Sequence, residues 1–395
     1  MKIKTILYVS ALASESRVNE EYKRTGANPG FAIQKFSRLL VEGLKINGAR
    51  VLAFSNPPNI AGKRKYISAV NETENGIRYK YIPYFNFPMI KHLCLFLYTF
   101  FYVLFWGAKG RNDKAIICDI LSVSICMGAL FATKINRVMN IAIVTDIYGM
   151  MVGSPKSFMS SLAGTLNRWY CNSFNKYILL TEQMNEVVNT KRRPYIVMEA
   201  VCDSSLLYEK PVNVNKKHPR TVIYAGGISE KYGLKMLAEG FIKAGVKDAK
   251  LIYYGSGSYV EEFKLLCAKY SNLEYRGVVP NDIIVAEELK ASLLVNPRFT
   301  SEEYTKYSFP SKNMEYMASG TPLLTTNLPG MPVEYQKYVF LFKEETVDGY
   351  ANAISQVLSH SELELRSFGL KASQFVLSNK NNIEQGRRIL KFIND

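Results

Sequence analysis

The sequence predicts an α/β protein with two doubly wound domains of parallel strands. Short apolar runs alternate with helical patterns along nearly the whole chain, and such alternation is typical of parallel sheets with right-handed crossovers. A polar segment without hydrophobic periodicity, residues 204–220, divides this alternation into two series. The length of 395 residues and the hydrophobic content of 48% are sufficient for two buried cores.

The first series supplies the first domain. Its apolar runs predict strands at residues 5–10, 51–54, 78–82, 115–118, 141–145, 177–180 and 195–197. Its helical periodicity predicts helices at residues 33–47, 158–173 and 182–190. If the two domains face each other, the carboxyl ends of their strands line one cleft, where such sheets bind ligands.

The second series supplies the second domain. Its predicted strands are residues 221–225, 250–254, 273–276, 293–296 and 322–325, with helices between them. The chain then ends in a helical region of about 35 residues. We therefore expect a first domain at residues 1–205 and a second domain at residues 206–375.

Charge is distributed unevenly between the two halves. Residues 1–200 contain 26 Lys and Arg against 12 Asp and Glu, whereas the remainder contains 24 against 22. A positive first half favours an anionic partner, which could be a membrane surface, nucleic acid or a phosphorylated substrate. No recognised nucleic-acid-binding motif or basic helix accompanies this charge, so we expect no nucleic-acid partner.

One segment, residues 93–108, has no charged residue and is rich in aromatic side chains. It is shorter than the ~20 apolar residues of a membrane span, and its aromatic content suits a membrane interface. Three interpretations stay open: a helix buried in the first domain, a helix that dips into the membrane surface, and, least favoured, a span. The second interpretation assigns membrane contact to Phe96, Phe100, Phe101, Phe105 and Trp106.

The cysteines and the N-terminus indicate a cytoplasmic chain. The six cysteines show no CxxC spacing and lie in apolar contexts, as expected of buried free thiols in a reducing compartment. The three histidines are scattered, so we expect no metal site. Residues 5–10 are interpreted as a first strand, not as part of a signal peptide.

Glycines follow three successive strands of the second series. Such glycines let backbone N–H groups approach a phosphate at the start of the next helix. Their recurrence at three strand ends argues against ordinary turns. The candidate ligand-binding residues at these strand ends are Gly226, Gly227, Lys231, Gly255, Ser256, Gly257, Arg276 and Val278.

The segment after Arg298 carries the strongest local signal. Ser311 and Lys312 open a predicted helix directly after Pro310, and a glycine stops this helix at position 320. A lysine in the first turn opposes the helix dipole, which an anion held between the helix and Lys312 would explain. Glu315 lies one turn later, and its carboxylate suits paired hydroxyls such as those of a ribose.

The first domain offers a loop and two acids. Asn28, Pro29 and Gly30 form a loop after the first strand, next to a predicted helix. Asp146 ends a central strand and is a candidate to orient or deprotonate an acceptor hydroxyl, although an ordinary strand-end aspartate stays open. Asp119, after another strand, is a weaker candidate of the same type.

These motifs resemble glycosyltransferase family 4 of the GT-B fold, in particular bacterial enzymes of capsule, O-antigen or exopolysaccharide assembly. The resemblance is carried by SFPSKNMEYMASGTPLLTTNLPG, YAGGISEKYGL, YYGSGSYVEEF and NLEYRGVVP in the second domain, and by layout alone in the first. It implies a nucleotide-sugar donor bound to the second domain and retention of anomeric configuration. It also implies that residues 376–395 pack back on the first domain, and that the loop at Gly30 approaches donor and acceptor.

The resemblance implies roles for single residues. Glu315 matches the second glutamate of the family's Glu-x7-Glu motif, which holds the donor ribose, whereas Tyr307 stands at the first glutamate. The family's diphosphate-binding arginine position is Gly227, which leaves Lys231 nearby. We therefore expect Arg298 and Lys312 to supply positive charge, assisted by backbone N–H groups after Gly226 and Ser311.

Together these features predict a glycosyltransferase that uses a nucleotide-sugar, with a UDP-sugar the expected donor. A lipid-linked saccharide acceptor at the cytoplasmic membrane face would explain the aromatic segment and the basic first half, because a polyprenyl diphosphate is both apolar and anionic. No Asp-x-Asp motif is present, so we expect catalysis without metal or other cofactor, with fixed positive groups in its place. The alternatives are a sugar-nucleotide epimerase of the same fold and a non-catalytic nucleotide-sugar binding protein.

Overall fold

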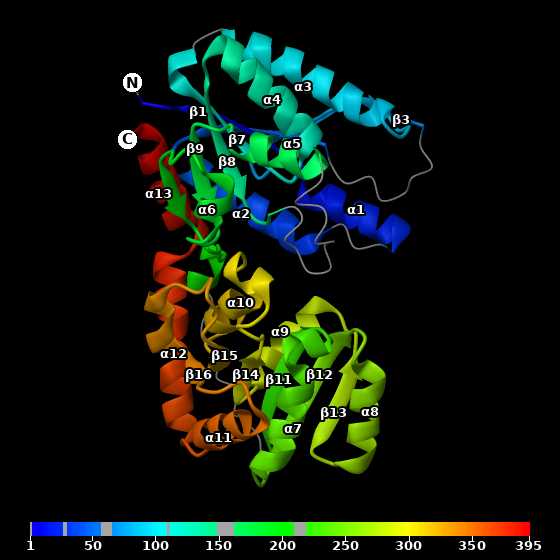
Figure 1. Ribbon diagram of the computed structural model, residues 1–395, viewed down its shortest axis with the longest axis vertical. Helices are drawn as coiled ribbons and strands as arrows, with labels where there is room; N and C mark the ends of the chain where they lie inside the picture. Colours follow the sequence, from blue (N-terminus) through cyan, green and yellow to red (C-terminus); the bar gives the residue numbers. More distant parts are fainter. Residues whose placement is uncertain (1, 27–29, 57–64, 109–110, 148–161, 209–218) are drawn as a thin grey trace. The chain divides into compact units, whose positions relative to one another are not determined.

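The computed structural model describes residues 2–26, 30–56, 65–108, 111–147, 162–208 and 219–395. The chain divides into two compact units (Figure 1). Unit 1 comprises Met1–Val201 together with Asn381–Asp395, and unit 2 comprises Cys202–Lys380. The domain boundary expected at residue 205 falls inside a short 3₁₀ helix, Ser204–Tyr208, that belongs to unit 2.

Unit 1 is built on an eight-stranded sheet of order β10-β9-β8-β7-β1-β2-β5-β4. All pairs are parallel except β4 with β5, which is antiparallel. The order reverses between β1 and β7, so this is the crossover point of the sheet. The strands are β1 Thr5–Ser10, β2 Arg50–Ser55, β4 Val70–Glu74, β5 Ile77–Tyr81, β7 Lys114–Asp119, β8 Met139–Val144, β9 Lys176–Leu179 and β10 Tyr195–Val197, with a separate pair, β3 Tyr66–Ile67 and β6 Tyr84–Phe85.

The central strands of unit 1 are buried on both faces. Ile116, Ile117 and Ile143 are fully buried, as expected where helices cover both sides of a parallel sheet. This explains why these strands are continuous apolar runs in the sequence. The helices are α1 Glu15–Thr25, α2 Phe31–Ile46, α3 Ile90–Ala108, α4 Val123–Asn136, α5 Leu162–Cys171, α6 Met184–Val188 and α13 Asn382–Asn394, with a 3₁₀ helix at Arg111–Asp113.

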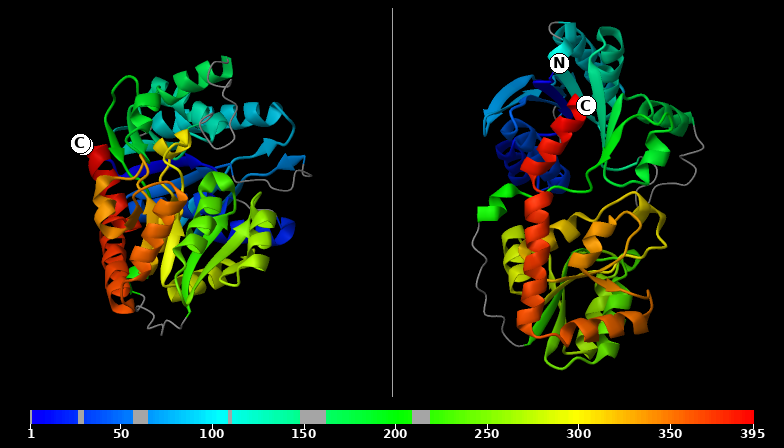
Figure 2. Two further views of the ribbon diagram at one scale, coloured as in Figure 1. Left: turned by 60° about the horizontal axis from the view of Figure 1, so that its bottom comes forward. Right: turned by 90° about the vertical axis from the view of Figure 1, so that its left-hand side faces the viewer.

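The C-terminal helix α13 completes unit 1 by packing against α2 (Figure 2). The two helices cross at glycines, because a Cβ atom at Gly386 would lie 2.4 Å from the backbone of Gly43. The Arg388 guanidinium also donates to the carbonyl oxygen of Val197 at 3.0 Å. Helix α13 is therefore an integral layer of unit 1, although it follows unit 2 in the sequence.

Unit 2 is a six-stranded parallel sheet of order β13-β12-β11-β14-β15-β16. Numbered along the chain, this is the order 3-2-1-4-5-6 of a Rossmann fold, and it reverses between β11 and β14. Ligands bind such sheets beyond the carboxyl ends of the strands at this reversal. The strands are β11 Arg220–Gly227, β12 Ala249–Ser256, β13 Leu273–Gly277, β14 Leu293–Asn296, β15 Leu323–Thr326 and β16 Phe340–Phe342.

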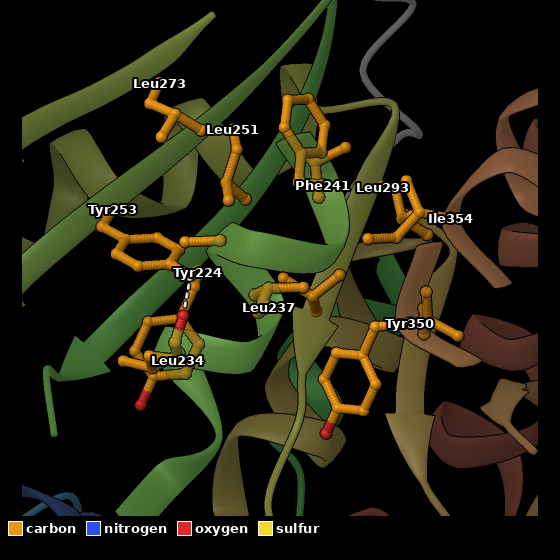
Figure 3. Close-up of a cluster of buried hydrophobic side chains, with 14 of the residues drawn as sticks. Tyr224, Leu234, Leu237, Phe241, Leu251, Tyr253, Leu273, Leu293, Tyr350 and Ile354 are labelled. Carbon is orange, nitrogen blue, oxygen red and sulfur yellow. Dashed lines mark hydrogen bonds between the residues drawn. The ribbon is translucent and has the colours of Figure 1, made fainter. Parts of the chain in front are cut away.

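The core of unit 2 lies between its sheet and the helices (Figure 3). Leu237 and Phe241 of α7 pack with Leu251 and Tyr253 of the sheet, and the Tyr253 hydroxyl donates to the Leu234 carbonyl at 2.8 Å. The helices are α7 Leu234–Ala244, α8 Val260–Lys269, α9 Asn281–Lys290, α10 Ser311–Ser319, α11 Val347–Leu358 and α12 Glu362–Asn379, with 3₁₀ helices at Glu230–Tyr232, Glu303–Lys306 and Val333–Tyr338.

The prediction of an α/β protein with two doubly wound sheets is confirmed. The structure adds elements that the sequence reading missed, including helix α1, the antiparallel edge strand β4 and the edge strand β16. Short edge strands carry little periodicity, which explains why β4 and β16 are not predicted. All six cysteines are free, and four of them are buried, as expected.

Candidate functional site

Two glycine-rich strand ends form the carboxyl edge of unit 2 beside the reversal of strand order. Gly226 of β11 pairs in register with Gly255 of β12. A Cβ atom at Gly255 would lie 1.8 Å from the Gly226 carbonyl oxygen, and one at Gly257 would lie 2.0 Å from the Ile228 carbonyl oxygen. No side chain fits at either position, so the predicted glycine motifs are required by close backbone approach.

Tyrosine hydroxyls hold the backbone of this edge in place. Three buried rings and the half-buried ring of Tyr275 each bond a backbone group near a strand end, so the edge is fixed before any ligand arrives. The bonds are Tyr224 to the Gly227 carbonyl at 2.9 Å, Tyr275 to the Gly255 carbonyl at 2.9 Å, Tyr350 to the Pro297 carbonyl at 3.0 Å, and the Ala225 N–H to the Tyr316 hydroxyl at 3.0 Å.

A buried polar network positions helix α10 against the same edge. The Asn296 side-chain amide donates to the Asn313 oxygen at 2.6 Å, and the Thr325 hydroxyl donates to the Asn296 carbonyl at 2.9 Å. All three residues are almost completely buried, where an unsatisfied amide is costly. The network therefore fixes the first turn of α10 relative to β14 and β15.

Lys312 lies in that first turn and reaches over the end of β11. Its Cε atom is 2.9 Å from the position that a Cβ atom would take at Gly226. The helix begins after Pro310 without a side-chain cap, and the Asn313 N–H donates to the Pro310 carbonyl at 2.9 Å, which leaves the N–H groups of Ser311 and Lys312 for an acceptor. Within the described residues Lys312 makes no ion pair or hydrogen bond, and its ammonium lies 5.8 Å from the centre of the Tyr316 ring.

Arg298 follows β14 and supplies a second cation without an acidic partner among the described residues. Its guanidinium lies 5.1 Å from the ring centre of Tyr232 and 6.0 Å from that of Tyr304. Its Nε atom is buried and has no hydrogen-bond partner in the described part of the chain. Burial raises the pKa of Tyr304 to about 12, and the charge of Arg298 opposes this rise. A half-buried guanidinium without a counter-charge favours an anionic ligand.

Arg276 is held by protein carboxylates. Its guanidinium contacts both oxygens of Glu274, at 2.7 and 3.3 Å, and also bonds Glu287 at 3.0 Å and the Tyr254 hydroxyl at 2.7 Å. The hydrogen bond to Glu274 is the main cause that raises the pKa of Arg276. Arg276 therefore fixes β13 to α9, and its charge is already neutralised.

The other residues predicted in unit 2 differ in exposure. Lys231, Ser256, Ser311 and Glu315 are exposed, Gly227 lies exposed at the end of β11, and Tyr307 is half-buried. Val278 is 73% exposed beyond β13. The carboxylate of Glu315 is thus accessible on α10, one turn after Lys312.

The carboxyl edge of unit 1 carries the two predicted aspartates. Asp119 ends β7 and Asp146 follows β8, on neighbouring parallel strands. Burial raises the pKa of each carboxyl to about 6, and the charge of Asp146 adds to the rise at Asp119. Gly30 begins α2 with a φ of +79°, whereas Asn28 and Pro29 lie outside the described residues. Two carboxyls that titrate near neutral pH can accept a proton from a hydroxyl.

Helix α3 is half-exposed. Leu95, Thr99, Val103 and Gly107, spaced by four residues, are buried beside α4. An opposite row is exposed, with Leu93 at 57%, Leu97 at 41%, Phe101 at 51% and Phe105 at 70%. Among the described residues α3 is the helix long and apolar enough to cross a membrane, a criterion that a core helix of a soluble protein also meets.

Several solved structures resemble the whole chain. A glycosyltransferase from Rickettsia africae ESF-5 is 16% identical, with a match over 99% of this chain and 98% of that chain at a TM-score of 0.66. Anabaena Alr3699/HepE in complex with UDP is 14% identical, over 100% and 99% at a TM-score of 0.64. The lipopolysaccharide outer core galactosyltransferase WaaB is 12% identical, over 98% and 99% at a TM-score of 0.62.

These likenesses identify the fold of the chain as GT-B, with two Rossmann-like domains, and so confirm the predicted fold class. Residues 219–360, which form most of unit 2, match the family model described as glycosyl transferases group 1. No curated protein sequence matches the chain. The matched segment contains the glycine-rich strand ends, Arg298 and Lys312.

The sequence reading missed the residues that support this edge. Tyr316 lies one turn from Lys312 on the same helix, a spacing that could have indicated a shared face. The network of Asn296, Asn313 and Thr325 joins three elements and has no local signal. Tyr232 lies within the motif YAGGISEKYGL and Tyr304 in none of the quoted motifs, and the sequence does not indicate that both flank Arg298.

Proposed function

We propose that the chain is a retaining, metal-independent glycosyltransferase that moves a sugar from a nucleotide-sugar, with UDP the favoured nucleotide, to a lipid-linked saccharide at the cytoplasmic membrane face. The family match over residues 219–360 supports glycosyl transfer. A resembling structure of the same fold was solved with UDP and glucose. Surface polysaccharide synthesis is the process in which such an acceptor is used.

The observation that carries the proposal is the pair of cations at the carboxyl edge of unit 2. Lys312 and Arg298 have no acidic partner among the described residues, and both lie at the reversal between β11 and β14. The open N-terminus of α10 adds a partial positive charge at the same place. A nucleoside diphosphate supplies the negative charge that this arrangement lacks.

The chemistry needs stabilisation of a departing diphosphate. The bond between the sugar C1 atom and the diphosphate oxygen breaks, and the diphosphate leaves with the electron pair. The acceptor oxygen bonds to C1 on the same face and gives its proton to an oxygen of the leaving phosphate. Lys312, Arg298 and the α10 N-terminus stabilise the charge that develops, and preorganised groups act in this way without a metal ion.

Glu315 and Asp146 complete the proposed roles. The exposed carboxylate of Glu315 accepts hydrogen bonds from the two ribose hydroxyls, one helical turn from Lys312. Asp146 orients the acceptor hydroxyl, assisted by its neighbour Asp119. Since the pKa of Asp146 is about 6, its ionised form increases as pH rises through 6, and kcat/KM should increase over the same range.

The exposed row on α3 supports a membrane-bound acceptor. Phe101 and Phe105 point out of the packed core, and aromatic side chains favour the membrane–water interface. Of the five residues predicted to contact the membrane, Phe96 and Phe100 are half-buried, with their rings in contact with each other and that of Phe96 also with Phe131. The Lys114 ammonium lies 4.7 Å from the ring centre of Trp106. Phe101 and Phe105 therefore carry most of the proposed contact.

Incubation of the purified chain with a panel of sugar nucleotides and a lipid extract tests the transfer. Release of free UDP should depend on the lipid acceptor and persist with EDTA. Release of an isomerised sugar nucleotide without acceptor would instead indicate an epimerase, and binding without turnover would indicate a non-catalytic binding protein.

A vesicle assay tests the membrane contact separately. The double variant Phe101→Ser/Phe105→Ser should bind vesicles at least about tenfold more weakly, because it removes two apolar side chains from the interface. Leu265→Ser/Leu363→Ser is a matched control, since these two leucines of unit 2 are 73% and 79% exposed. Equal binding of the two variants would contradict the role of α3.

A further inference from the structure

Unit 1 contains a basic cavity at the edge of its sheet opposite Asp119 and Asp146. The cavity has a volume of about 410 Å³ and lies where α4 and α5 end and where β8, β9 and β10 begin. Its lining includes Lys134, Arg137, Asn140, Trp169, Lys191 and Arg193. This edge is remote from the strand ends to which the proposed transfer assigns residues.

The lining contains four cations and no acid. Lys134, Arg137, Lys191 and Arg193 form no ion pair among the described residues, whereas many other basic side chains of the chain do, such as Arg38 with Glu15. Four cations around one cavity repel each other unless an anion is bound. The cavity is therefore complementary to a group with more than one negative charge, or to several phosphate oxygens.

Stabilisation of α4 explains only half of this charge. Lys134 lies in the last turn of α4 and Arg137 caps that helix with a φ of +58°, so both complement the helix dipole. Lys191 and Arg193 come from the separate segment between α6 and β10 and lie outside the last turn of α6. The Asn189 side chain fixes this segment: its oxygen accepts from the Arg193 N–H at 2.8 Å, and its amide donates to the Arg193 carbonyl at 2.7 Å.

A continuous row of aromatic rings joins the cavity to the exposed helix α3. The Phe100 and Phe96 ring centres are 6.3 Å apart, Phe96 and Phe131 are 5.9 Å apart, and Phe131 and Trp169 are also 5.9 Å apart. The Lys134 ammonium lies 4.9 Å from the Trp169 ring centre. The row runs from α3 across α4 to α5, and α3 and α4 lie side by side (Figure 1).

The rings next to the cavity are accessible. Phe131 is 37% exposed, Trp169 is 43% exposed and Ile135, on the same helix as Phe131, is 63% exposed. Tryptophan and lysine side by side are typical of the headgroup level of a membrane, where the ring contacts acyl chains and the ammonium contacts phosphate. A soluble anion would need the cations alone, with no use for exposed rings beside them.

We propose that this basic cavity binds the phosphate headgroup of an anionic phospholipid in the membrane surface that α3 contacts. The inference rests on the membrane contact in the proposed function, but it is independent of the glycosyl transfer. The cavity then determines how unit 1 is oriented on the membrane, because Phe101 and Phe105 fix one point and the headgroup fixes another. A basic pocket beside apolar residues is a known form of lipid recognition.

Vesicle co-sedimentation of the full chain tests the cavity. The double variant Arg137→Gln/Arg193→Gln should lose at least tenfold of its affinity for phosphatidylcholine vesicles that contain phosphatidylglycerol. Its binding to pure phosphatidylcholine vesicles should change less than twofold, because α3 is intact. Arg192→Gln/Lys247→Gln is the matched control, since it removes the same charge from exposed residues that do not line the cavity. The control should change the affinity less than threefold.

Three results would overturn the proposal. Equal losses in the two double variants would assign the effect to net charge alone. Unchanged vesicle affinity, together with saturable binding of inorganic phosphate that the cavity variant loses, would assign the cavity to a soluble anion. Binding of a short RNA that depends on Arg137 and Arg193, with no lipid dependence, would assign it to nucleic acid. UDP release by the cavity variant with a detergent-dispersed acceptor checks the transfer separately, and should equal that of the original chain.

Discussion

The sheets of the two units differ in strand number and order but share a reversal beside the first strand, and they use their two edges differently. In both, parallel strands reverse their order beside the first strand, and the carboxyl ends at this reversal carry the candidate chemistry. Unit 2 places there glycines whose backbone is held by tyrosine hydroxyls, and two cations that have no acidic partner in the described part of the chain. Unit 1 places the buried Asp119 and the half-buried Asp146 there and gathers four cations around a cavity at the opposite edge.

This difference teaches that the charge of a region does not by itself locate an anion site. Unit 2 is nearly neutral in sequence, yet Lys312 and Arg298, which have no acidic partner among the residues that the structure describes, mark the proposed diphosphate site. Arg276 shows the contrast, because its guanidinium lies at the same edge and is neutralised by Glu274 and Glu287. The availability of a charge therefore matters more than the number of charges.

Substitution of Lys312 should produce the largest effect. Lys312→Ala removes one of the two available cations, and loss of one preorganised group at a developing charge reduces kcat by about 10²–10³. Steady-state kinetics with the nucleotide-sugar measure the change, and Lys290→Ala is the control because Lys290 is paired with Glu287. Kinetics within threefold of the original enzyme would exclude Lys312 from the site.

The next effect concerns the buried carboxyl of Asp119. Its pKa is raised from 3.8 to about 6 on folding, so the folded state loses stability as pH rises from about 4 to 6. Asp119→Asn keeps the acceptor for the Leu121 N–H and removes this loss, which amounts to at most about 3 kcal/mol. Urea unfolding of the original chain and of Asp119→Asn between pH 4 and 8 gives the difference in their free energies of unfolding. The stability of the variant relative to the original chain should increase as pH rises.

A flat difference over that pH range would show that Asp119 has an ordinary pKa. The matched change in unit 2, Asp282→Asn, alters a carboxyl on the exposed surface of α9. The stability difference that Asp282→Asn causes should depend little on pH. The comparison therefore separates the effect of burial from the loss of a negative charge.

The hydrogen bonds of the tyrosine hydroxyls in unit 2 can be tested by removal of one hydroxyl group. Tyr316→Phe removes the hydroxyl that bonds the Ala225 backbone and should reduce the free energy of unfolding by about 1–3 kcal/mol, because a buried N–H is left without its acceptor. Chemical denaturation measures the loss, and Tyr270→Phe is the control on a half-buried ring. Equal stability of the two variants would show that the hydroxyl does not fix the strand end.

A smaller effect is expected at Gly226. A Cβ atom there would lie 2.9 Å from Cε of Lys312 and 3.0 Å from the Tyr224 hydroxyl, so Gly226→Ala should displace the flexible lysine end. We expect kcat/KM to fall by about tenfold, since a small misplacement of a charge weakens its stabilising effect. An unchanged melting temperature with reduced activity would support this reading, and full activity would contradict it.

The sequence predicts the strands and the glycines well because both obey local rules. Strand β1, Thr5–Ser10, is predicted with its observed bounds, and Gly255 and Gly257 are required by backbone approach. The first-turn position of Lys312 also follows from local signals around Pro310. These features depend on periodicity and backbone geometry, which a single sequence carries.

The remaining features depend on contacts between distant residues. Arg276 is paired with Glu287, which only folding brings to it, so its neutralisation has no sequence signal. The basic cavity gathers cations from two segments, the end of α4 and the segment before β10. The sequence of α3 does not decide between a buried and an exposed helix, and the structure shows one buried row and one exposed row on opposite faces.

The contact of Gly43 with Gly386 makes unit 2 an insertion within unit 1. During synthesis the ribosome completes unit 2 first, and unit 1 cannot complete its packing until helix α13 has been synthesised. A stop codon placed after Lys380 would thus leave a whole second unit attached to an unfinished first one, although it deletes residues far in sequence from every strand of unit 1.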